Sequence, residues 1–154
     1  MIAVIQRVTR AAVTADGLPS GNCGKGFLIL LGVLKGDDAE DVRLLAEKIS
    51  KLRVFEDEAG KMNLALADVS GGLLVVSNFT LGANYAHGNR PDFFGSASPD
   101  VAEPLYEDFI RQIKAKGIPC ESGVFGADMQ INMEADGPVT IVMDSAVLRK
   151  GKKG

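Results

Sequence analysis

Runs of apolar residues separated by polar turns predict a chain rich in strands. Residues 2–15 are β-branched and apolar, which is typical of a strand, and Asp16-Gly17 is typical of the turn that ends it. The apolar segments 27–34 and 73–79 predict two fully buried strands. Apolar and polar side chains alternate through residues 128–134, which is the period of a half-exposed strand.

Two further segments have apolar residues at helical spacing and predict helices. Asp38 is a candidate N-cap for the first helix, and Ser98-Pro99 supplies an N-cap and an N1 proline for the second. The first helix has the apolar stripe Val42, Leu45, Ile49 and Leu52. The second has the core-facing stripe Val101, Leu105, Phe109 and Ile113. With about six or more strands, two such helices predict one domain of layered sheets with helices on one side.

Composition limits the class of protein. The chain has 154 residues, 46% hydrophobic and 24% charged, which is ordinary for a globular domain. Its longest apolar run, 27–34, is far shorter than the roughly 20 residues of a membrane-spanning helix. The first residues lack the ordered regions of a signal peptide. The two cysteines, Cys23 and Cys120, are expected to be reduced thiols, and we expect a cytoplasmic protein.

Charge argues against a protein that coats duplex nucleic acid. The net charge is −3 and the pI about 5.2, whereas such proteins are usually basic. Basic residues do gather at the end of the chain, in residues 149–154. We expect this segment to be a flexible, solubilising tail. An auxiliary contact with phosphate is the alternative.

Few residues offer familiar catalytic or metal-binding chemistry. No Cys or His pair has zinc-ligand spacing, so no metal site is expected. The segment 21–26 has the wrong glycine spacing for a nucleotide-binding loop and predicts a hairpin turn. A Ser-His-Asp triad would need His87, the one histidine, which falls in a long polar stretch at 82–98. A solvated loop residue is the other interpretation of His87.

Two short segments stand out without settling a function. Ser77-Asn78-Phe79-Thr80-Leu81 follows a buried strand, where hydroxyl and amide groups can line a site or simply satisfy the strand end. Gly137-Pro138 breaks the last apolar pattern, which returns at 139–143. Asp136-Gly137 alone would predict a hairpin turn.

Four ordered segments resemble one family, the D-aminoacyl-tRNA deacylases of the bacterial and eukaryotic type. The segments are Ser77–Leu81, Gly88–Phe93, Gly123–Met129 and Asp136–Ile141. With the opening residues 3–8, the resemblance covers nearly the whole chain. It implies that residues 1–148 form a single mixed α/β domain of α+β character. The domain is expected to have three layers, β/β/α, with mostly antiparallel sheets, and to pair as a homodimer.

The resemblance also implies an activity. The expected enzyme is a hydrolase without cofactor or metal, which cleaves the ester of D-aminoacyl-tRNA, and of glycyl-tRNA, and releases free tRNA. Ser77, Phe79 and Thr80 would surround the ester, with backbone N–H groups near Phe79 and Thr80 as oxyanion donors. The residues expected to bind substrate are Asn78, Phe125, Gly126, Ala127 and Met129, the last four of them lining the pocket for the 3′-terminal adenosine. Those expected to support the motifs are Arg7, Asn89, Arg90 and Pro91.

Stereochemical selection is expected to come from Gly137-Pro138. The resemblance implies that this bond is cis and enters the partner subunit's pocket. Its two flanking carbonyl groups would then exclude an L side chain. Either Thr80 acts as the nucleophile or the neighbouring ribose 2′-hydroxyl assists the attack. We favour the 2′-hydroxyl, because the sequence offers no general base beside Thr80.

Two departures from the family pattern and two alternative functions remain open at this point. Asn78 stands where the family usually has Gln, so its hydrogen bonds are uncertain from sequence, and Ala86-His87 stands where many relatives have lysines. One alternative is a non-catalytic module of the same fold that binds RNA ends or nucleotides. The other is a generic hydrolase that uses His87 with Ser77 or Thr80.

Overall fold

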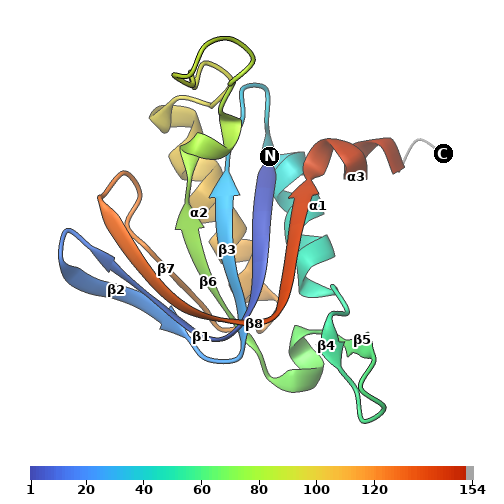
Figure 1. Ribbon diagram of the computed structural model, residues 1–154. Coiled ribbons are helices and arrows are strands. Elements are labelled where there is room, and N and C mark those ends of the chain that lie inside the picture. The colour runs from blue at the N-terminus through green and yellow to red at the C-terminus, as the bar shows by residue number, and fades with distance from the viewer. Residues whose placement is uncertain (152–154) are drawn as a thin grey trace.

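The molecule is built on a six-stranded mixed sheet (Figure 1). The computed structural model describes residues 1–151 of the chain. The strands of the large sheet are β1 (Ile2–Ala15), β2 (Leu18–Cys23), β3 (Gly26–Gly32), β6 (Gly72–Ser77), β7 (Cys120–Ser122) and β8 (Met129–Asp144). Their order is β2-β1-β3-β6-β7, and β8 pairs with β1 on its other side. The β3–β6 and β6–β7 pairs are parallel, and the three pairs made by β1 are antiparallel.

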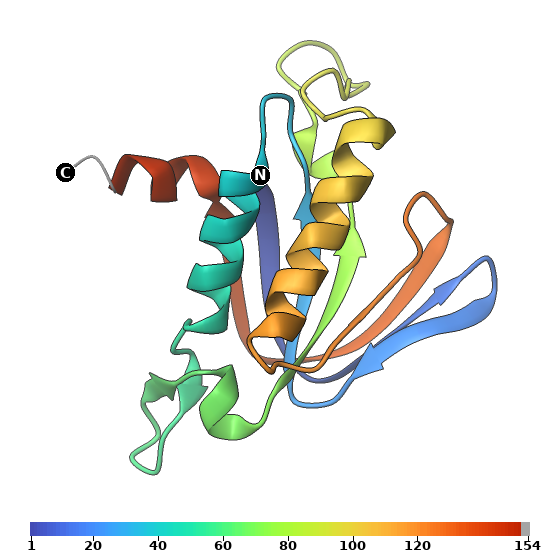
Figure 2. The ribbon, with the colours of Figure 1, turned by 180° about the vertical axis from the view of Figure 1, so that it is seen from behind.

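Helices cover one face of this sheet. They are α1 (Ala39–Ser50), α2 (Pro99–Ala115) and the short α3 (Ser145–Gly151). Figure 2, the view from behind, shows α1 and α2 side by side in front of the central strands. The smaller elements are the hairpin of β4 (Phe55–Glu56) and β5 (Met62–Leu64) and two 3-10 turns, η1 (Leu66–Val69) and η2 (Phe79–Gly82). Within residues 1–151, no helix combines the length and apolarity needed to cross a membrane.

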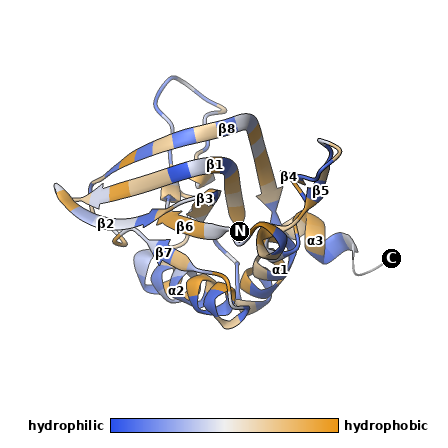
Figure 3. Ribbon diagram, turned by 90° about the horizontal axis from the view of Figure 1, so that it is seen from below, coloured by the Kyte–Doolittle hydropathy of each residue, from blue (hydrophilic) through white to orange (hydrophobic). Residues whose placement is uncertain are grey.

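The sheet bends over itself, so the domain has three layers (Figure 3). Phe27, Ile29 and Leu31 of β3 point into the main core against the helices. The intervening Leu28 packs into a second core with Val8 and Val13 from the two halves of β1. Because successive strand residues point to opposite faces, β3 and β6 are buried on both sides. The expected mixed α/β domain with β/β/α layers is confirmed.

The first helix begins as predicted. The side chain of Asp38 accepts a hydrogen bond from the Glu40 N–H at 2.9 Å, and Asp41 accepts one from the Asp38 N–H at 2.9 Å. This reciprocal arrangement is a capping box, which satisfies donors that a helix start leaves unpaired.

The second helix begins at Pro99, also as predicted, but its buried face is shifted from the predicted stripe. The buried residues are Ala102, Tyr106, Phe109 and Ile113. Val101 is 43% exposed, so its prediction as a core residue is wrong. Positions 102, 106, 109 and 113 follow one helical face, and residue 101 lies about 100° away from it.

The break predicted at Gly137-Pro138 is a bulge within one continuous strand. Glu134 pairs with Arg10 and Thr140 pairs with Gln6, so both flanks of the motif lie against β1. A hairpin turn at this position would have reversed the chain, and that interpretation is wrong. The register against β1 shifts on both sides of Val8, which is the mark of a bulge. The Gly137–Pro138 peptide bond is cis.

Part of the expected tail is helical. Arg149 and Lys150 belong to α3, and Arg149 hydrogen-bonds Asp41 with two of its nitrogens, at 2.9 and 2.7 Å. Arg149 also pairs with Asp38. The charge of Arg149 is therefore used at the start of α1 rather than on a free tail. The rest of the expected tail, residues 152–154, lies outside the described residues.

Candidate active site

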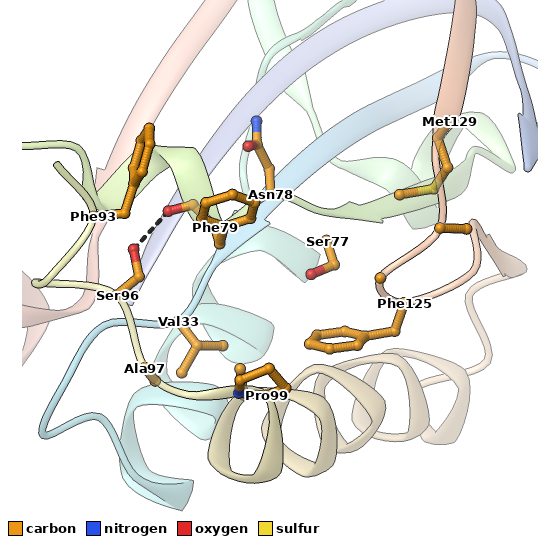
Figure 4. Close-up of a pocket in the computed structure, with 13 residues that line it drawn as sticks. Val33, Ser77, Asn78, Phe79, Phe93, Ser96, Ala97, Pro99, Phe125 and Met129 are labelled. Carbon is orange, nitrogen blue, oxygen red and sulfur yellow. Dashed lines mark hydrogen bonds between the residues drawn. The ribbon is translucent and has the colours of Figure 1, made fainter. Parts of the chain in front are cut away.

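A pocket of about 490 Å³ opens where β6 ends (Figure 4). The lining residues come from the segment after β3, the end of β6, η2, the loop before α2, the start of α2, and the segment that leads into the first residue of β8. They are Val33, Ser77, Asn78, Phe79, Phe93, Ser96, Ala97, Pro99, Ala102, Phe125, Gly126, Ala127 and Met129. None of these side chains carries a charge. The pocket therefore suits a flat, neutral group better than a phosphate.

Aromatic side chains give the pocket its walls. Phe79 meets Phe93 edge to face, with ring centroids 5.1 Å apart. Phe125 packs against Tyr106 with a centroid distance of 5.8 Å. The Tyr106 hydroxyl donates to the Val75 carbonyl at 3.0 Å, and burial raises the pKa of Tyr106 to about 12. Tyr106 thus anchors the wall as a neutral phenol.

The polar groups of the site cluster at the start of η2. Asn78 caps this turn, and its Oδ1 accepts hydrogen bonds from the Thr80 N–H at 3.2 Å and the Thr80 hydroxyl at 2.5 Å. The expectation that both the Phe79 and Thr80 N–H groups are available as donors therefore needs revision. Within the turn, the Thr80 N–H is engaged by Asn78, while the Phe79 N–H has no acceptor among the described residues.

The structure brings most of the predicted pocket residues together. Ser77, Asn78 and Phe79 line one side of the pocket, and Phe125, Gly126, Ala127 and Met129 line the other. Thr80 is not one of the lining residues: it is exposed next to them, and its hydroxyl donates to Asn78.

Arg7, Gly137 and Pro138 lie elsewhere in the same chain. The Arg7 side chain is almost buried and donates to the carbonyl oxygens of Asp136, at 3.2 Å, and Val54, at 2.6 Å. Gly137 and Pro138 are exposed beside it on β8. In the register of the sheet, Arg7 faces Phe27, at the opposite end of β3 from the residue that pairs with Ser77. The Gly-Pro motif is therefore separated from its own chain's pocket.

The polar stretch 82–98 is a loop, as predicted. Asn84 and Asp92 close it through paired backbone hydrogen bonds of 2.8 and 3.0 Å. Asn89, Arg90 and Pro91 are exposed between these two residues, and so is His87. Among the described residues, no hydrogen bond joins His87 to Ser77 or Thr80. The arrangement does not assemble a triad around His87.

The cysteines and carboxylates outside the pocket form no second chemical centre. Cys23 and Cys120 are free thiols, and burial raises the pKa of Cys120 to about 11. Such a thiol is a poor nucleophile because only the thiolate reacts readily. Across residues 1–151, no three His, Cys, Asp or Glu side chains gather as metal ligands would.

Sequence reasoning missed the part of the wall formed after β3, in the loop before α2 and at the start of α2. Val33, Phe93, Ser96, Ala97, Pro99 and Ala102 line the pocket and were not among the predicted site residues. The sequence does hold a usable signal for these residues: the helix start predicted at Ser98-Pro99 means that the end of the polar loop must return to the body of the domain. The structure places this return beside the ends of β3 and β6, where Ala97 N–H bonds Val33 at 3.0 Å.

Comparison with known proteins assigns the family. Residues 4–144 match the family model described as D-Tyr-tRNA(Tyr) deacylase. A protein named D-aminoacyl-tRNA deacylase from Anaeromyxobacter dehalogenans (strain 2CP-C) is 54% identical over 145 residues, 94% of this chain and 97% of the relative. Another of that name from Chloroflexus aurantiacus (strain ATCC 29364 / DSM 637 / Y-400-fl) is 55% identical over 149 residues, 97% of this chain and 93% of the relative.

A solved structure has the same fold. It is described as c-Myc DNA Unwinding Element Binding Protein, with a TM-score of 0.87 and 40% sequence identity. The match covers 94% of this chain and 98% of the other. Family match, curated relatives and fold agree over nearly the full length, and this chain belongs to the D-Tyr-tRNA(Tyr) deacylase family.

Proposed function

We propose that this protein hydrolyses the ester bond of D-aminoacyl-tRNA at the pocket beside η2, with the 3′-terminal adenosine bound inside. Free tRNA and the D-amino acid are the products, and glycyl esters are also substrates. The observation that carries the proposal is the unpaired Phe79 N–H at the rim of an uncharged pocket. A backbone donor in that position can stabilise the negative charge that develops on an ester carbonyl oxygen.

The pocket is suited to the end of a tRNA rather than to its helix. The walls made by Phe125, Ala127 and Met129 offer apolar surface for a nucleobase. Among the described residues that line the pocket there is no lysine or arginine, which favours a neutral nucleoside over a phosphate as the group bound inside it. This accounts for a substrate made of nucleic acid in a chain of net charge −3.

The reaction follows from these groups. Water adds to the ester carbonyl carbon, and the charge on the carbonyl oxygen is stabilised by the Phe79 N–H. The bond to the ribose 3′-oxygen then breaks, and that oxygen takes up the proton lost by the water, relayed by the neighbouring 2′-hydroxyl. Thr80 is not the nucleophile, because its hydroxyl donates to Asn78 and no base faces it.

Selection against L-aminoacyl esters comes from Gly137-Pro138 of a second copy. Leu73 pairs with Phe27, and the distance along β6 from Leu73 to Ser77 is roughly 13 Å. Across the sheet, β8 lies three strand spacings of about 4.8 Å from β6. The motif is thus too far from its own pocket to meet the ester. It is exposed and held from behind by Arg7, so it is available to a partner's pocket, and the active unit is a homodimer.

Substitution of the motif tests this arrangement. Gly137 has a φ of +124°, and a Cβ there would lie 2.8 Å from the Val139 nitrogen, so Gly137→Ala forces the motif to move. We expect D-aminoacyl-tRNA hydrolysis to fall about tenfold or more, from misplacement of the substrate by about 1 Å. Gly17→Ala is the matched control, because Gly17 also has a positive φ but nothing near its Cβ position. A Gly137→Ala variant with full activity would contradict the role of the motif.

The activity itself is tested with matched D-, L- and glycyl-tRNA substrates and purified protein, with and without a metal chelator. We expect release from the D- and glycyl substrates only, unchanged by the chelator. Binding without release would favour the alternative of a non-catalytic RNA-end module. Release that stops in the chelator would contradict a metal-independent reaction.

A further inference from the structure

The peptide group that joins Phe79 to Thr80 is held at both of its polar atoms. The Ser96 hydroxyl donates to the Phe79 carbonyl oxygen at 2.6 Å (Figure 4). The Thr80 N–H, at the other end of the same peptide group, donates to Asn78 Oδ1 at 3.2 Å. Two side chains from separate segments therefore fix the orientation of one peptide plane.

The neighbouring backbone atoms of the turn are also engaged. The Asn78 N–H donates to the Leu31 carbonyl at 2.9 Å, and the Asn78 carbonyl accepts from the Leu81 N–H at 3.4 Å. The Thr80 carbonyl accepts from the Ala83 N–H at 3.1 Å. Through residues 78–80 the Phe79 N–H is then the single backbone donor with no partner in the described part of the chain.

Ser96 is itself held firmly in place. It is only 9% exposed, and its flanking residues hydrogen-bond the segment after β3: Lys35 N–H to Gly95 O at 2.9 Å, and Ala97 N–H to Val33 O at 3.0 Å. Gly82 allows the close approach, because a Cβ at that position would lie 2.3 Å from Ser96 Oγ. The hydroxyl has little freedom to turn away from the Phe79 carbonyl.

Asn78 also suits this arrangement. Asn is among the preferred N-cap residues because its short side chain returns to the backbone two residues on. The Thr80 hydroxyl adds a second donor to the same oxygen. The Oδ1 atom of Asn78 is thus occupied within the turn, where it fixes Thr80.

We propose that Ser96 and Asn78 are positioning residues that clamp the Phe79–Thr80 peptide and with it the Cα of Phe79. The Phe79 N–H belongs to the preceding Asn78–Phe79 peptide, whose carbonyl is held by the Leu81 N–H, so the clamp on the other side of the Cα keeps this N–H aimed at the substrate ester. The proposal rests on the proposed function. An oxyanion donor contributes most when it needs no reorganisation during the reaction. Hydrogen bonds at both ends of the Phe79–Thr80 peptide resist its rotation, and the Leu81 N–H bond to the Asn78 carbonyl restrains the adjoining peptide that carries the Phe79 N–H.

The test is steady-state hydrolysis of D-tyrosyl-tRNA by the full chain. In Ser96→Ala we expect kcat to fall about tenfold with KM changed less than twofold, because the clamp acts on transition-state geometry. Asn78→Ala should behave alike. The double variant should lose less than the product of the two single losses, because both side chains act on one peptide group. Ser98→Ala is the matched control, since Ser98 is exposed on the same loop and its side chain makes no cap hydrogen bond.

The outcomes separate this proposal from the proposed function. Wild-type protein that releases no D-tyrosine overturns both. Active wild-type protein with a Ser96→Ala variant that matches Ser98→Ala overturns the clamp alone, and so do fully multiplicative losses or a change confined to KM. If Ser96→Ala does not fold, Gly82→Ala displaces the hydroxyl instead. It should give the same fall in kcat, and full activity would overturn the clamp.

Discussion

Two helix starts in this molecule have the same kind of cap and different surroundings. At α1, the carboxylates of Asp38 and Asp41 cap the helix, and Arg149 and the buried Ser145 bind Asp41. At η2, the neutral amide of Asn78 caps the turn and the Ser96 hydroxyl binds the Phe79 carbonyl. The first cluster is charged and lies away from the pocket, whereas the second is uncharged and lines it.

This difference in charge and location indicates that the cluster at α1 serves stability and the cluster at η2 serves function. Charged groups around α1 satisfy one another completely, so their contribution is to hold α3 and α1 together. The cluster at η2 leaves one donor unpaired. Its groups do not titrate, so the donor faces a neutral substrate in the same state at any ordinary pH. A backbone donor without a partner lowers the free energy of unfolding, and a substrate that accepts its hydrogen bond in the pocket can offset this loss.

The largest expected effect comes from removal of the Phe79 N–H. Phe79→Pro deletes the N–H, and proline is tolerated here because Phe79 is the first residue of η2 and Asn78 before it is extended. We expect kcat to fall about 100-fold, the loss typical of one oxyanion donor. Phe79→Ala is the control, since it removes the ring and keeps the N–H. Equal losses in the two variants would assign the effect to the ring instead.

The next variant acts on the other cluster. Ser145 is fully buried, and its hydroxyl donates to Asp41 Oδ1 at 2.7 Å. Ser145→Ala should lower the free energy of unfolding by about 2 kcal/mol, because a buried carboxylate loses a donor. Chemical denaturation measures the loss, and kcat at a temperature well below unfolding should be unchanged. A fall in kcat without a loss of stability would break the separation between the two clusters.

The two clusters also differ in how far the sequence predicts them. The α1 cap was predictable because Asp38 and the acidic first turn are local signals. The η2 cluster was only half predictable. Ser77–Thr80 was found as a strand end, but the bond from Ser96 spans 17 residues and depends on how the loop returns. The family resemblance implied that Asn78 binds substrate, and its role as the cap of η2 became visible only from its bonds with Thr80.

The same limit applies along β8 and α2. The alternation of Met129, Ile131 and Met133 predicts a strand correctly, because it is a local pattern. The continuation through Gly137-Pro138 could not be predicted, because the residues on both sides pair with β1, more than a hundred positions away in the sequence. Val101 was misplaced for a similar reason: which face of α2 is buried is decided by contacts with the sheet.

A smaller effect should appear in the pH dependence of stability. Burial by itself would raise the pKa of Asp41, but hydrogen bonds from Arg149, the Asp38 N–H and Ser145 hold it well below its usual value. A carboxyl with a lowered folded pKa adds stability above its unfolded pKa, near 3.9, and loses it as the pH falls toward the folded pKa. As the pH falls from about 5 to 2, the free energy of unfolding of the wild type should therefore decrease more steeply than that of Asp41→Asn. Parallel curves for the two proteins would contradict the role of Asp41.

The smallest expected effect concerns His87, which tests whether the uncharged cluster acts alone. His87 is exposed on the loop and makes no hydrogen bond with Ser77 or Thr80 in the described residues. We therefore expect His87→Ala to keep kcat for D-aminoacyl-tRNA within about twofold, since a general base would be worth about 100-fold or more. Tyr85→Ala, at another exposed position of the same loop, is the control for general loop effects. A loss near 100-fold in His87→Ala alone would place a titrating base in the reaction. The contrast between a charged structural cluster and a neutral functional one would then fail.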